Sequence, residues 1–330
     1  MGRKSNKVVI FGGGTGLSII LRGLKLFTDD ITAIVTVADD GGGSGVLRSD
    51  LGMLPPGDIR NCIISLADTP PVMERLMQHR FQEGQLKGQS FGNLLIAAMN
   101  EMYGDFDYAI KEISNIFRIR GRVLPMTLED IHLHGELENG SVICGENKIP
   151  LMAKQTKQKI HRVFLSPETC EPLEETIQSI LEADIIVLGP GSLYTSVIPN
   201  LLVKDIPYWI KQSKAEVYYI CNIMTQPGET DGYDVKDHVK ALWDHAPDLP
   251  IHYILANNQI IPDTVSEIYK QEKSEMVKLD SLQESFLNKK NIKIISDNFL
   301  DIEQNYIRHD AVQLSKTILQ DNRIIRFKAR

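Results

Sequence analysis

The chain has 330 residues, a length that allows one large α/β domain or two smaller ones. Its composition, 42% hydrophobic and 24% charged, is that of an ordinary globular protein. Its 43 acidic and 36 basic residues give a net charge of −7, which argues against a general nucleic-acid or anionic-membrane surface. The cysteines are far apart and form no C-x-x-C pair, which argues against a disulfide frame or a zinc site. We expect buried free thiols at Cys62, Cys144, Cys170 and Cys221.

The first elements form a βαβ unit. A short apolar strand over 7–11 leads through glycines into a helical pattern over 16–27, and the uncharged β-branched run over 31–37 suits a buried parallel strand. Such a unit opens a doubly wound sheet. After the turn at 55–58, we expect Asp58 to cap the next helix. Helical patterns follow over 72–81, 90–102, with Ser90 as a good N-cap, and 105–117.

From residue 122 to 150 the pattern changes to short runs in which apolar and polar residues alternate. The segments 131–137 and 141–144 flank an Asn-Gly turn and predict a β-hairpin, so we expect an antiparallel excursion here, then a polar linker over 154–159. The α/β alternation is expected to return afterwards, with strands over 162–165, 184–188, 216–221, 251–256 and 292–295 and helices over 173–181, 235–245, 263–271 and 308–319.

These patterns predict a Rossmann-like doubly wound fold, with a mainly parallel sheet, helices on both faces and a small antiparallel β excursion. We expect one domain over 1–330, with a helical and β-hairpin insert at about 70–160. No run of 18 apolar residues occurs, and no secretory apolar segment follows the basic N-terminal run, so we expect a cytoplasmic protein without membrane insertion.

Two glycine-rich loops each follow an apolar run and lead toward a helix. Backbone N–H groups at such a helix start can bind phosphate. The first loop fits the dinucleotide fingerprint only in part, and it is no Walker loop. A tight turn required for packing is the alternative for each loop. The candidate residues are Gly12, Gly13, Gly14, Thr15 and Gly16 in the first loop, Gly189, Gly191, Ser192, Tyr194 and Thr195 in the second, and the polar Asn222, Thr225 and Gln226 after the next strand.

An acidic glycine loop, residues 39–45, follows the second strand. Asp39 and Asp40 could bind a ribose diol, hold Mg²⁺, or cap the following turn. They are the candidate catalytic residues if the protein is an enzyme. Ser44, Arg48 and Arg60 lie on the same side of this unit, and the arginines could bind phosphate or be plain surface cations.

Two histidine motifs are weaker. His132 and His134, with Glu136 in step, would share one face of a strand, which fits a metal site or, more commonly, a solvated face. Arg308 and His309, expected at the start of the last helix, could face an anionic ligand. The spacing shows no Ser-His-Asp or Cys-His arrangement.

Together, several motifs resemble the CofD-like family over nearly the whole chain. They are 11–17, 38–42, 56–61 (PGDIRN), 92–94 (GNL), 189–196 (GPGSLYTS) and 221–226 (CNIMTQ) with the tail GETDG. The family includes 2-phospho-L-lactate transferases, which use a guanosine-diphosphate-linked donor and Mg²⁺. It also includes bacterial gluconeogenesis factors of the YvcK type, linked to cell shape and wall synthesis.

Runs such as 31–37 and 194–203 look closer to the second branch, whose members are understood as binders of UDP-sugars. The resemblance implies that Tyr269 stacks on the base or sugar and that Arg308 contacts the pyrophosphate. Asp58, Arg60 and Asn93 lie in the shared motifs and join the expected ligand-binding residues. Gly43 departs from the serine common in related chains, which weakens metal ligation by this loop.

Three hypotheses follow. In the leading hypothesis, the chain is a regulatory protein that binds UDP-N-acetylglucosamine or UDP-glucose and requires no cofactor. Its further partners would be other copies of itself, in a homo-oligomer, or cell-wall synthesis proteins. The second is a transferase similar to 2-phospho-L-lactate transferase, with Mg²⁺ at Asp39 and Asp40. The third, a dinucleotide-dependent redox enzyme, is the weakest because the third fingerprint glycine is misplaced. Nucleic acid is not an expected partner.

Overall fold

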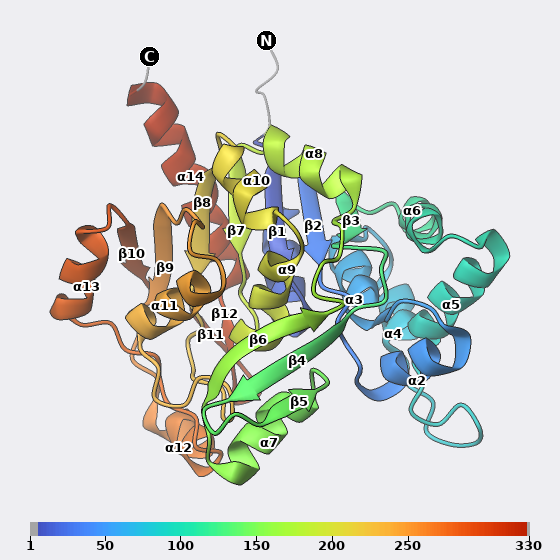
Figure 1. Cartoon of the computed structure of the whole chain (residues 1–330). Coiled ribbons are helices and arrows are strands. Elements are labelled where there is room, and N and C mark those ends of the chain that lie inside the picture. Colours follow the sequence, from blue (N-terminus) through green and yellow to red (C-terminus); the bar gives the residue numbers. More distant parts are fainter. Residues whose placement is uncertain (1–5, 329–330) are drawn as a thin grey trace.

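A seven-stranded parallel sheet forms the centre of the computed structural model, which describes residues 6–328 (Figure 1). The strand order is β10-β9-β8-β7-β1-β2-β3. The strands are β1 (Val8–Gly12), β2 (Ile31–Val35), β3 (Arg122–Pro125), β7 (Ile185–Leu188), β8 (Glu216–Ile220), β9 (Tyr253–Asn257) and β10 (Lys293–Asp297). The order reverses at β1, where the chain runs to β2 on one side and later returns to β7 on the other.

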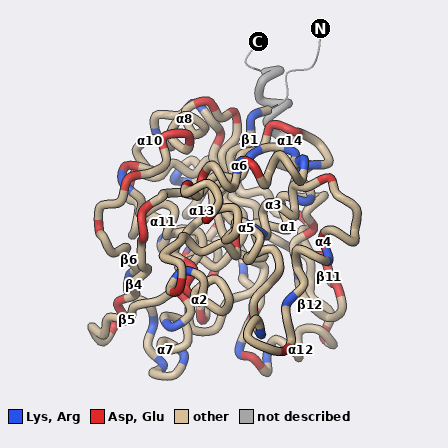
Figure 2. Tube along the Cα trace, turned by 90° about the vertical axis from the view of Figure 1, so that its right-hand side faces the viewer, with Lys and Arg blue, Asp and Glu red and all other residues tan. Residues whose placement is uncertain are grey.

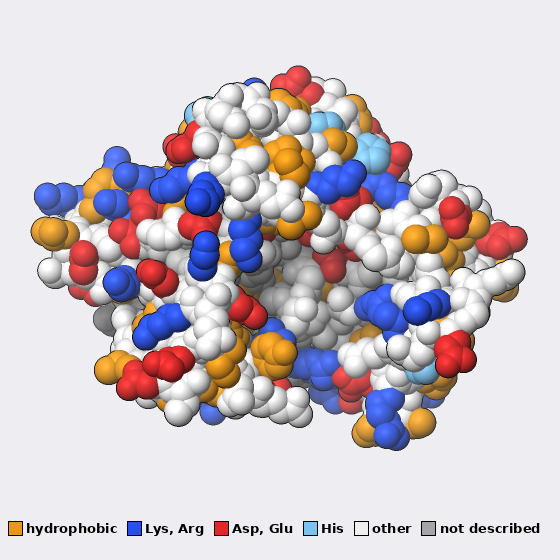
Figure 3. All heavy atoms as spheres, turned by 90° about the horizontal axis from the view of Figure 1, so that it is seen from below, with side chains coloured by type: hydrophobic (Ala, Val, Ile, Leu, Met, Phe, Trp, Pro, Cys, Tyr) orange, Lys and Arg blue, Asp and Glu red, His pale blue; other side chains and the backbone are white. Residues whose placement is uncertain are grey.

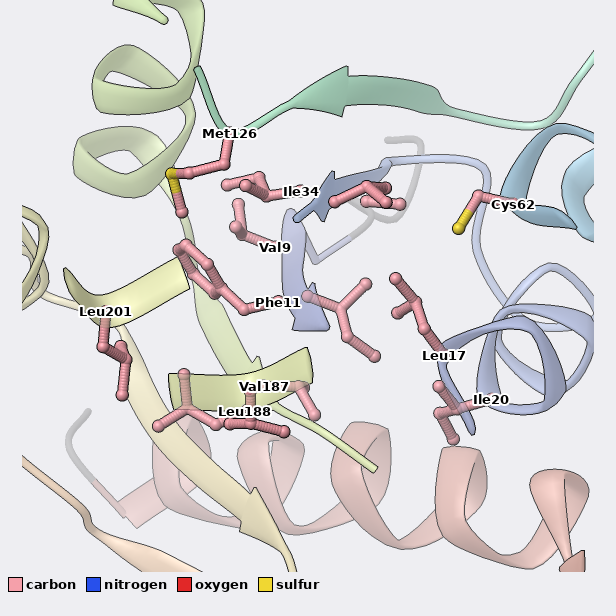
Figure 4. Packing of buried hydrophobic residues seen from close by; sticks show 14 of the residues in the cluster. Val9, Phe11, Leu17, Ile20, Ile34, Cys62, Met126, Val187, Leu188 and Leu201 are labelled. Carbon is pink, nitrogen blue, oxygen red and sulfur yellow. The ribbon is translucent and has the colours of Figure 1, made fainter. Parts of the chain in front are cut away.

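The central strands are apolar because both of their faces are covered. Every residue of β1, β2 and β7 is buried, as expected for uncharged runs in a parallel sheet. Val8 of β1 lies between Ile31 and Ile185, its register partners in β2 and β7. Around them Phe11, Leu17 and Leu188 pack into one continuous core (Figure 4).

Helices cover both faces of the sheet, which confirms the predicted doubly wound α/β class (Figure 1). On one face α1 (Gly14–Leu24) packs against α3 (Gly57–Leu66) and α14 (Ala311–Lys328). The other face carries α8 (Glu174–Glu182), α9 (Ile198–Leu202), α10 (Ile206–Gln212) and α11 (Val235–His245). The remaining helices are α2 (Gly42–Leu51), α4 (Pro71–Gln78), α5 (Phe91–Tyr103), α6 (Phe106–Ile116), α7 (Lys148–Thr156), α12 (Asp263–Gln271) and α13 (Ser281–Asn288).

The predicted hairpin is present in a three-stranded antiparallel sheet of order β5-β4-β6. Its strands are β4 (His132–Leu137), β5 (Val142–Cys144) and β6 (Ile160–Ser166). Gly140 of the Asn-Gly turn has φ +82°, a conformation that glycine adopts without strain. A second hairpin, β11 (Leu300–Glu303) with β12 (Tyr306–His309), lies before α14.

Several sequence expectations were wrong in detail. The strand at 122–125 is not part of the antiparallel excursion but pairs in parallel with β2. The strand at 162–165 does not rejoin the main sheet, because β6 pairs antiparallel with β4. The segment 154–159 is no linker over its first half, since α7 runs to Thr156. Cys144 is exposed, whereas Cys62, Cys170 and Cys221 are buried free thiols as expected.

Charged residues of both signs are interspersed along the trace (Figure 2). Within residues 6–328, no helix is long and apolar enough to cross a membrane. Residues 1–5 of the basic N-terminal run lie outside the described residues.

Candidate functional site

The two glycine-rich loops touch each other. A Cβ atom on Gly16 would lie 2.6 Å from the carbonyl oxygen of Pro190 and 2.9 Å from the Cα atom of Gly191. On the core side, the Asn200 amide donates hydrogen bonds to the carbonyl oxygens of Gly12 (3.2 Å) and Ser196 (2.8 Å). Only glycine at position 16 permits this approach, so the loops form one unit at the carboxyl edge of β1 and β7.

A cleft of about 330 Å³ opens beside this contact, at the edge where ligands of doubly wound folds bind. We call it the interloop cleft. In the view from below, the molecule is hollowed between two bulges (Figure 3). The residues lining the cleft are Gly16, Ile19, Pro190, Gly191, Asn222, Ile223, Met224, Thr225, Gln226, Pro227, Tyr269, Glu272, Ser274, Ile307, Arg308 and His309.

The segment after β8 fastens the second loop to the cleft. The Asn222 amide nitrogen donates to the Gly191 carbonyl (2.8 Å), and the Gly191 N–H donates to the Asn222 amide oxygen (3.4 Å). The Ser192 hydroxyl donates to the Gln226 side-chain oxygen (2.8 Å). These contacts fix the loop conformation, so a ligand meets a wall that is already ordered.

The far wall of the cleft comes from α12 and the β11–β12 hairpin. Tyr269 accepts a hydrogen bond from the Ile307 N–H (2.8 Å), which ties α12 to β12. Next to Ile307, Arg308 is half-buried and has no ion-pair partner among the described residues. Its guanidinium carbon lies 5.7 Å from the Tyr306 ring centroid. The expectation that Arg308 starts the final helix was wrong, because α14 begins at Ala311.

His309 is a structural member of this wall. Burial lowers its pKa to about 4, so the ring is neutral at pH 7. Its Nε2 lies 3.2 Å from the Cys221 carbonyl oxygen, which requires the proton on that nitrogen. His309 therefore joins β12 to the end of β8 and brings no positive charge to a ligand.

Asp58 occupies part of the first loop's amide surface. It does not cap α3, as the sequence suggested, because the N-cap is Pro56 and Asp58 lies inside the first turn. Its carboxylate accepts a hydrogen bond from the Gly14 N–H, and a Cβ atom on Gly13 would lie 2.6 Å from it. Burial, and secondarily Asp39, raise the pKa of Asp58 to about 6. A carboxylate thus lies where the loop pattern predicted a phosphate.

The second loop also holds a buried carboxylate, which comes from the polar run 228–232 after β8. Glu229 accepts hydrogen bonds from the Tyr194 N–H (3.2 Å) and the Thr195 hydroxyl (3.2 Å), and Gln226 donates to it as well (2.9 Å). Burial raises its pKa to about 7, against the effect of these hydrogen bonds. The motif GETDG contained this residue, but nothing local showed that its carboxylate would face the loop amides.

A second hollow, of about 280 Å³, is lined in part by Asp58, and we call it the acidic-loop pocket. Asp39 and Asp58 line it, whereas Asp40 turns away to accept hydrogen bonds from the Asn147 N–H (3.3 Å) and side-chain amide (3.2 Å). Three carboxyl groups therefore interact here, those of Asp39, Asp58 and Glu146. The Glu146 side chain forms a hydrogen bond with Asp39, and its burial together with these acidic neighbours raises the pKa of Glu146 to about 9. The lining residues are Asp39, Gly41, Gly42, Gly43, Ser44, Gly57, Asp58, Arg60, Asn61, Arg80, Asn93 and Asn147.

Not every candidate residue reaches these two hollows. Tyr194 points away from the cleft, and its hydroxyl pairs with that of Tyr233 at 2.7 Å. Thr195 is held by Glu229, and Thr15 is exposed without lining either hollow. Gly12 and Gly189 are buried parts of the turns. Arg48 is neither a surface cation nor a pocket residue, because it is buried against Asp130 and the Ile131 carbonyl.

Of the two alternatives for His132, His134 and Glu136, a metal site or a strand face, the side chains form the strand face. Among residues 6–328, no group of three or more His, Cys, Asp or Glu side chains is placed to hold a metal ion. The His134 ring stacks on Phe164 with centroids 5.2 Å apart, and Glu136 pairs with Arg162 at 2.7 Å. These side chains belong to the face of the antiparallel sheet.

Comparison with known proteins decides the family. The family model described as 2-phospho-L-lactate transferase CofD matches residues 8–300. The chain belongs to the CofD family. A relative from Thermoanaerobacterium thermosulfurigenes is 54% identical over 313 residues, covering 95% of this chain and 96% of its own. The protein of Bacillus subtilis named "Gluconeogenesis factor" is 48% identical over 320 residues, covering 97% and 98%.

A solved structure has the same fold. The crystal structure of a UPF0052 family member from Bacillus halodurans superposes with a TM-score of 0.90 at 49% sequence identity, covering 96% of this chain and all of that one. This CofD-family member is thus similar over nearly its full length to proteins named gluconeogenesis factors.

Proposed function

We propose that this CofD-family protein binds a UDP-sugar, UDP-N-acetylglucosamine or UDP-glucose, in the interloop cleft and acts as a regulatory gluconeogenesis factor. The observation that carries the proposal is the position of Arg308. A half-buried guanidinium without a carboxylate partner faces the same cleft as Gly16 and Gly191. Arginine is suited to bidentate contact with a diphosphate.

The other walls of the cleft fit the remaining parts of such a ligand. The Tyr269 ring offers an aromatic surface for the base or sugar, and its hydroxyl is already used by Ile307, so the face of the ring is what remains. Asn222 and Gln226 add amide groups that can contact hydroxyls. Because Asp58 and Glu229 occupy amides of the loops, we place the diphosphate between Gly16, Gly191 and Arg308.

The test is Arg308→Ala. Loss of a charge-assisted contact is expected to weaken UDP-N-acetylglucosamine binding by ~1.5–3 kcal/mol, about 10- to 150-fold. Isothermal titration calorimetry measures this, with GDP and ATP as competing ligands and Arg162→Ala as a control on the antiparallel sheet. An unchanged affinity in folded Arg308→Ala would remove this assignment. A role in wall synthesis and cell shape would appear as loss of growth on gluconeogenic carbon in a strain that carries the variant.

A second candidate function is that of a Mg²⁺-dependent transferase using a nucleoside-diphosphate-linked donor. It is favoured by Asp39 and Asp58, two carboxylates on one wall beside the first loop. Mg²⁺ commonly takes one or two carboxylates and several waters, so these residues would hold it and it would offset charge on a transferring phosphate. Turnover of such a donor that disappears in Asp39→Asn would support this function, and a panel of donors without turnover would count against it.

A further inference from the structure

A third cavity, of about 480 Å³, lies at the free edge of the central sheet. It is lined by residues of α6 and α8, by the turn between α6 and β3, and by β3 itself, the outermost strand (Figure 1). We call it the edge pocket. None of its lining residues belongs to the interloop cleft or to the acidic-loop pocket. The turn lies at the amino end of β3, whereas the cleft lies beyond the carboxyl ends of β1 and β8, so the two sites are at opposite ends of the parallel strands.

The floor of the edge pocket is apolar and ordered. Val123 and Leu124, which line it from β3, are 3% and 1% exposed. Ile119, in the turn before β3, is half-buried and packs against the same hydrophobic core as Val123. The sheet holds these residues in place, and an apolar group that leaves water to pack on them gains free energy. The floor therefore suits the apolar body of a small molecule.

Two guanidinium groups also line the pocket without a carboxylate at ion-pair distance. Arg118 and Arg122 form no ion pair within residues 6–328. Arg122 donates through Nη2 to the neutral hydroxyls of Thr32 (3.1 Å) and Ser179 (3.3 Å), which fixes the side chain between β2 and α8. The hydroxyls orient this cation but do not neutralise it.

The carboxylates nearby are already engaged by ammonium groups. Glu175, the acidic residue of the lining, accepts a hydrogen bond from Lys111 at 2.7 Å. Glu182 accepts one from Lys7, also at 2.7 Å. This hydrogen bond is the largest cause that lowers the pKa of Glu182, and the more distant charge of Arg122 is the smallest. The two guanidinium groups therefore remain as the cations that can meet the charge of a ligand.

Arg118 stands at a helix end where glycine is the usual residue. The Ile119 N–H donates to the Ser114 carbonyl and the Arg118 N–H to the Asn115 carbonyl, both at 3.2 Å, which closes α6. This closure holds Arg118 at φ +47°, a left-handed conformation that is unfavourable for a residue with a Cβ atom. Glycine would end the helix at lower cost, so a role of the guanidinium in the pocket accounts for an arginine here.

We propose that the edge pocket is a binding site for a small amphiphilic carboxylate, a short aliphatic or aromatic acid. The carboxylate lies between Arg118 and Arg122, whose planar forks suit its two oxygens, and the apolar body packs on Ile119 and Val123. A volume of about 480 Å³ is within the range of small-molecule sites.

The experiment is a titration of the full chain with hexanoate, a linear aliphatic carboxylate, followed by amide NMR shifts. We expect the signals of Ile119, Gly121 and Val123 to move with a dissociation constant of about 1 mM. Hexanamide has the same body without the charge, and inorganic phosphate has charge without the body. Each of them should bind at least about tenfold more weakly, because the site uses both features.

Arg118→Gly is the variant that separates binding from folding. It removes the guanidinium and relieves the left-handed backbone, so we expect a melting temperature not below that of the wild type and hexanoate binding weakened about tenfold. Arg120→Ala is the matched control. It removes the same charge two residues away, from a side chain that pairs with Asp68 (2.9 Å) outside the pocket, and should change the affinity by less than about twofold.

The proposal is overturned if hexanoate leaves these signals unchanged at about 20 mM, or if hexanamide or phosphate binds as tightly as hexanoate. Equal weakening by Arg118→Gly and Arg120→Ala would overturn it as well, because the response would then follow net charge and not the pocket. Arg308→Ala should leave hexanoate binding unchanged, and Arg118→Gly should leave UDP-N-acetylglucosamine binding unchanged, so the two sites give separate results.

Discussion

The two glycine-rich loops are similar in sequence position but differ in how their amides are used. Each contacts a carboxylate, the half-buried Asp58 at the first loop and the buried Glu229 at the second. Glu229 is enclosed by donors from the loop and from Gln226, whereas Asp58 also borders the acidic-loop pocket beside Asp39. The second loop is therefore a closed, internally satisfied structure, and the first remains open to exchange with a ligand or cation. A glycine-rich loop by itself does not show that its amides are free.

The largest expected effect tests the closed state of the second loop. Burial raises the pKa of Glu229 from 4.5 to about 7. The folded state then holds this proton more tightly than the unfolded chain, so the contribution of Glu229 to stability is greatest below pH 4.5 and is lost as the pH rises toward 7. We expect Glu229 to cost about 3 kcal/mol in the free energy of unfolding between pH 4.5 and 7. Urea unfolding at pH 5, 6, 7 and 8 measures this.

Glu229→Gln should remove that decline, while Asp58→Asn should remove one that is complete by about pH 6, because the pKa of Asp58 is raised only to about 6. The two variants therefore compare the loops directly. If Glu229→Gln and wild type had the same pH profile, Glu229 would not be a buried carboxylate that titrates in this range.

A smaller effect is expected where the loops touch. In Gly16→Ala, the new methyl group would lie 2.6 Å from the Pro190 carbonyl oxygen, and backbone atoms must move. Such overpacking is expected to lower the free energy of unfolding by about 2 kcal/mol and to weaken UDP-sugar binding, because the cleft wall shifts. Thermal unfolding with and without ligand measures both. The exposed Thr15→Ala is the control, and a Gly16→Ala protein of wild-type stability would contradict the observed contact.

The smallest effect tests the openness of the first loop. Asp58→Asn removes a negative charge beside the Gly14 amide while keeping an oxygen that can accept its hydrogen bond. We expect UDP-N-acetylglucosamine affinity above pH 7 to rise about threefold, since repulsion of the diphosphate decreases. Asp40→Asn is the matched control, because that side chain faces Asn147. Calorimetry would contradict the comparison if both substitutions acted equally.

The sheet was predictable from the sequence because its central strands are uncharged runs separated by glycine turns. The run over 31–37 and the helix cap at Ser90 needed only local information, and the structure confirms both elements. The segment at 122–125 was misassigned because its partner is β2, about 90 residues earlier, and strand pairing at that distance leaves no local signal. The glycine-rich start of α2 also disguised a helix, since glycine is a poor helix former.

The sequence predicted many of the residues that line the interloop cleft, but not the contacts that their side chains make. The first loop follows β1, whereas Asn222 and Gln226 follow β8, and the parallel sheet places Gly16 with the two amides at one cleft. The resemblance to the family suggested Tyr269 and Arg308, and both line that cleft. The directions of the Asp40 and Tyr194 side chains could not be predicted, because they depend on neighbours from other elements. Asp40 turns toward Asn147, and Tyr194 turns toward Tyr233.

The pairing of β1 with β7 has a consequence for how the chain is made. Val8 meets Ile185 only after more than half of the polypeptide has left the ribosome, so the apolar border of the first strand stays uncovered during most of synthesis. Arg308 is made later still, and a growing chain can possess both glycine turns while lacking the cation opposite them. The binding mode proposed for the interloop cleft thus depends on a residue that the nascent protein acquires late in synthesis.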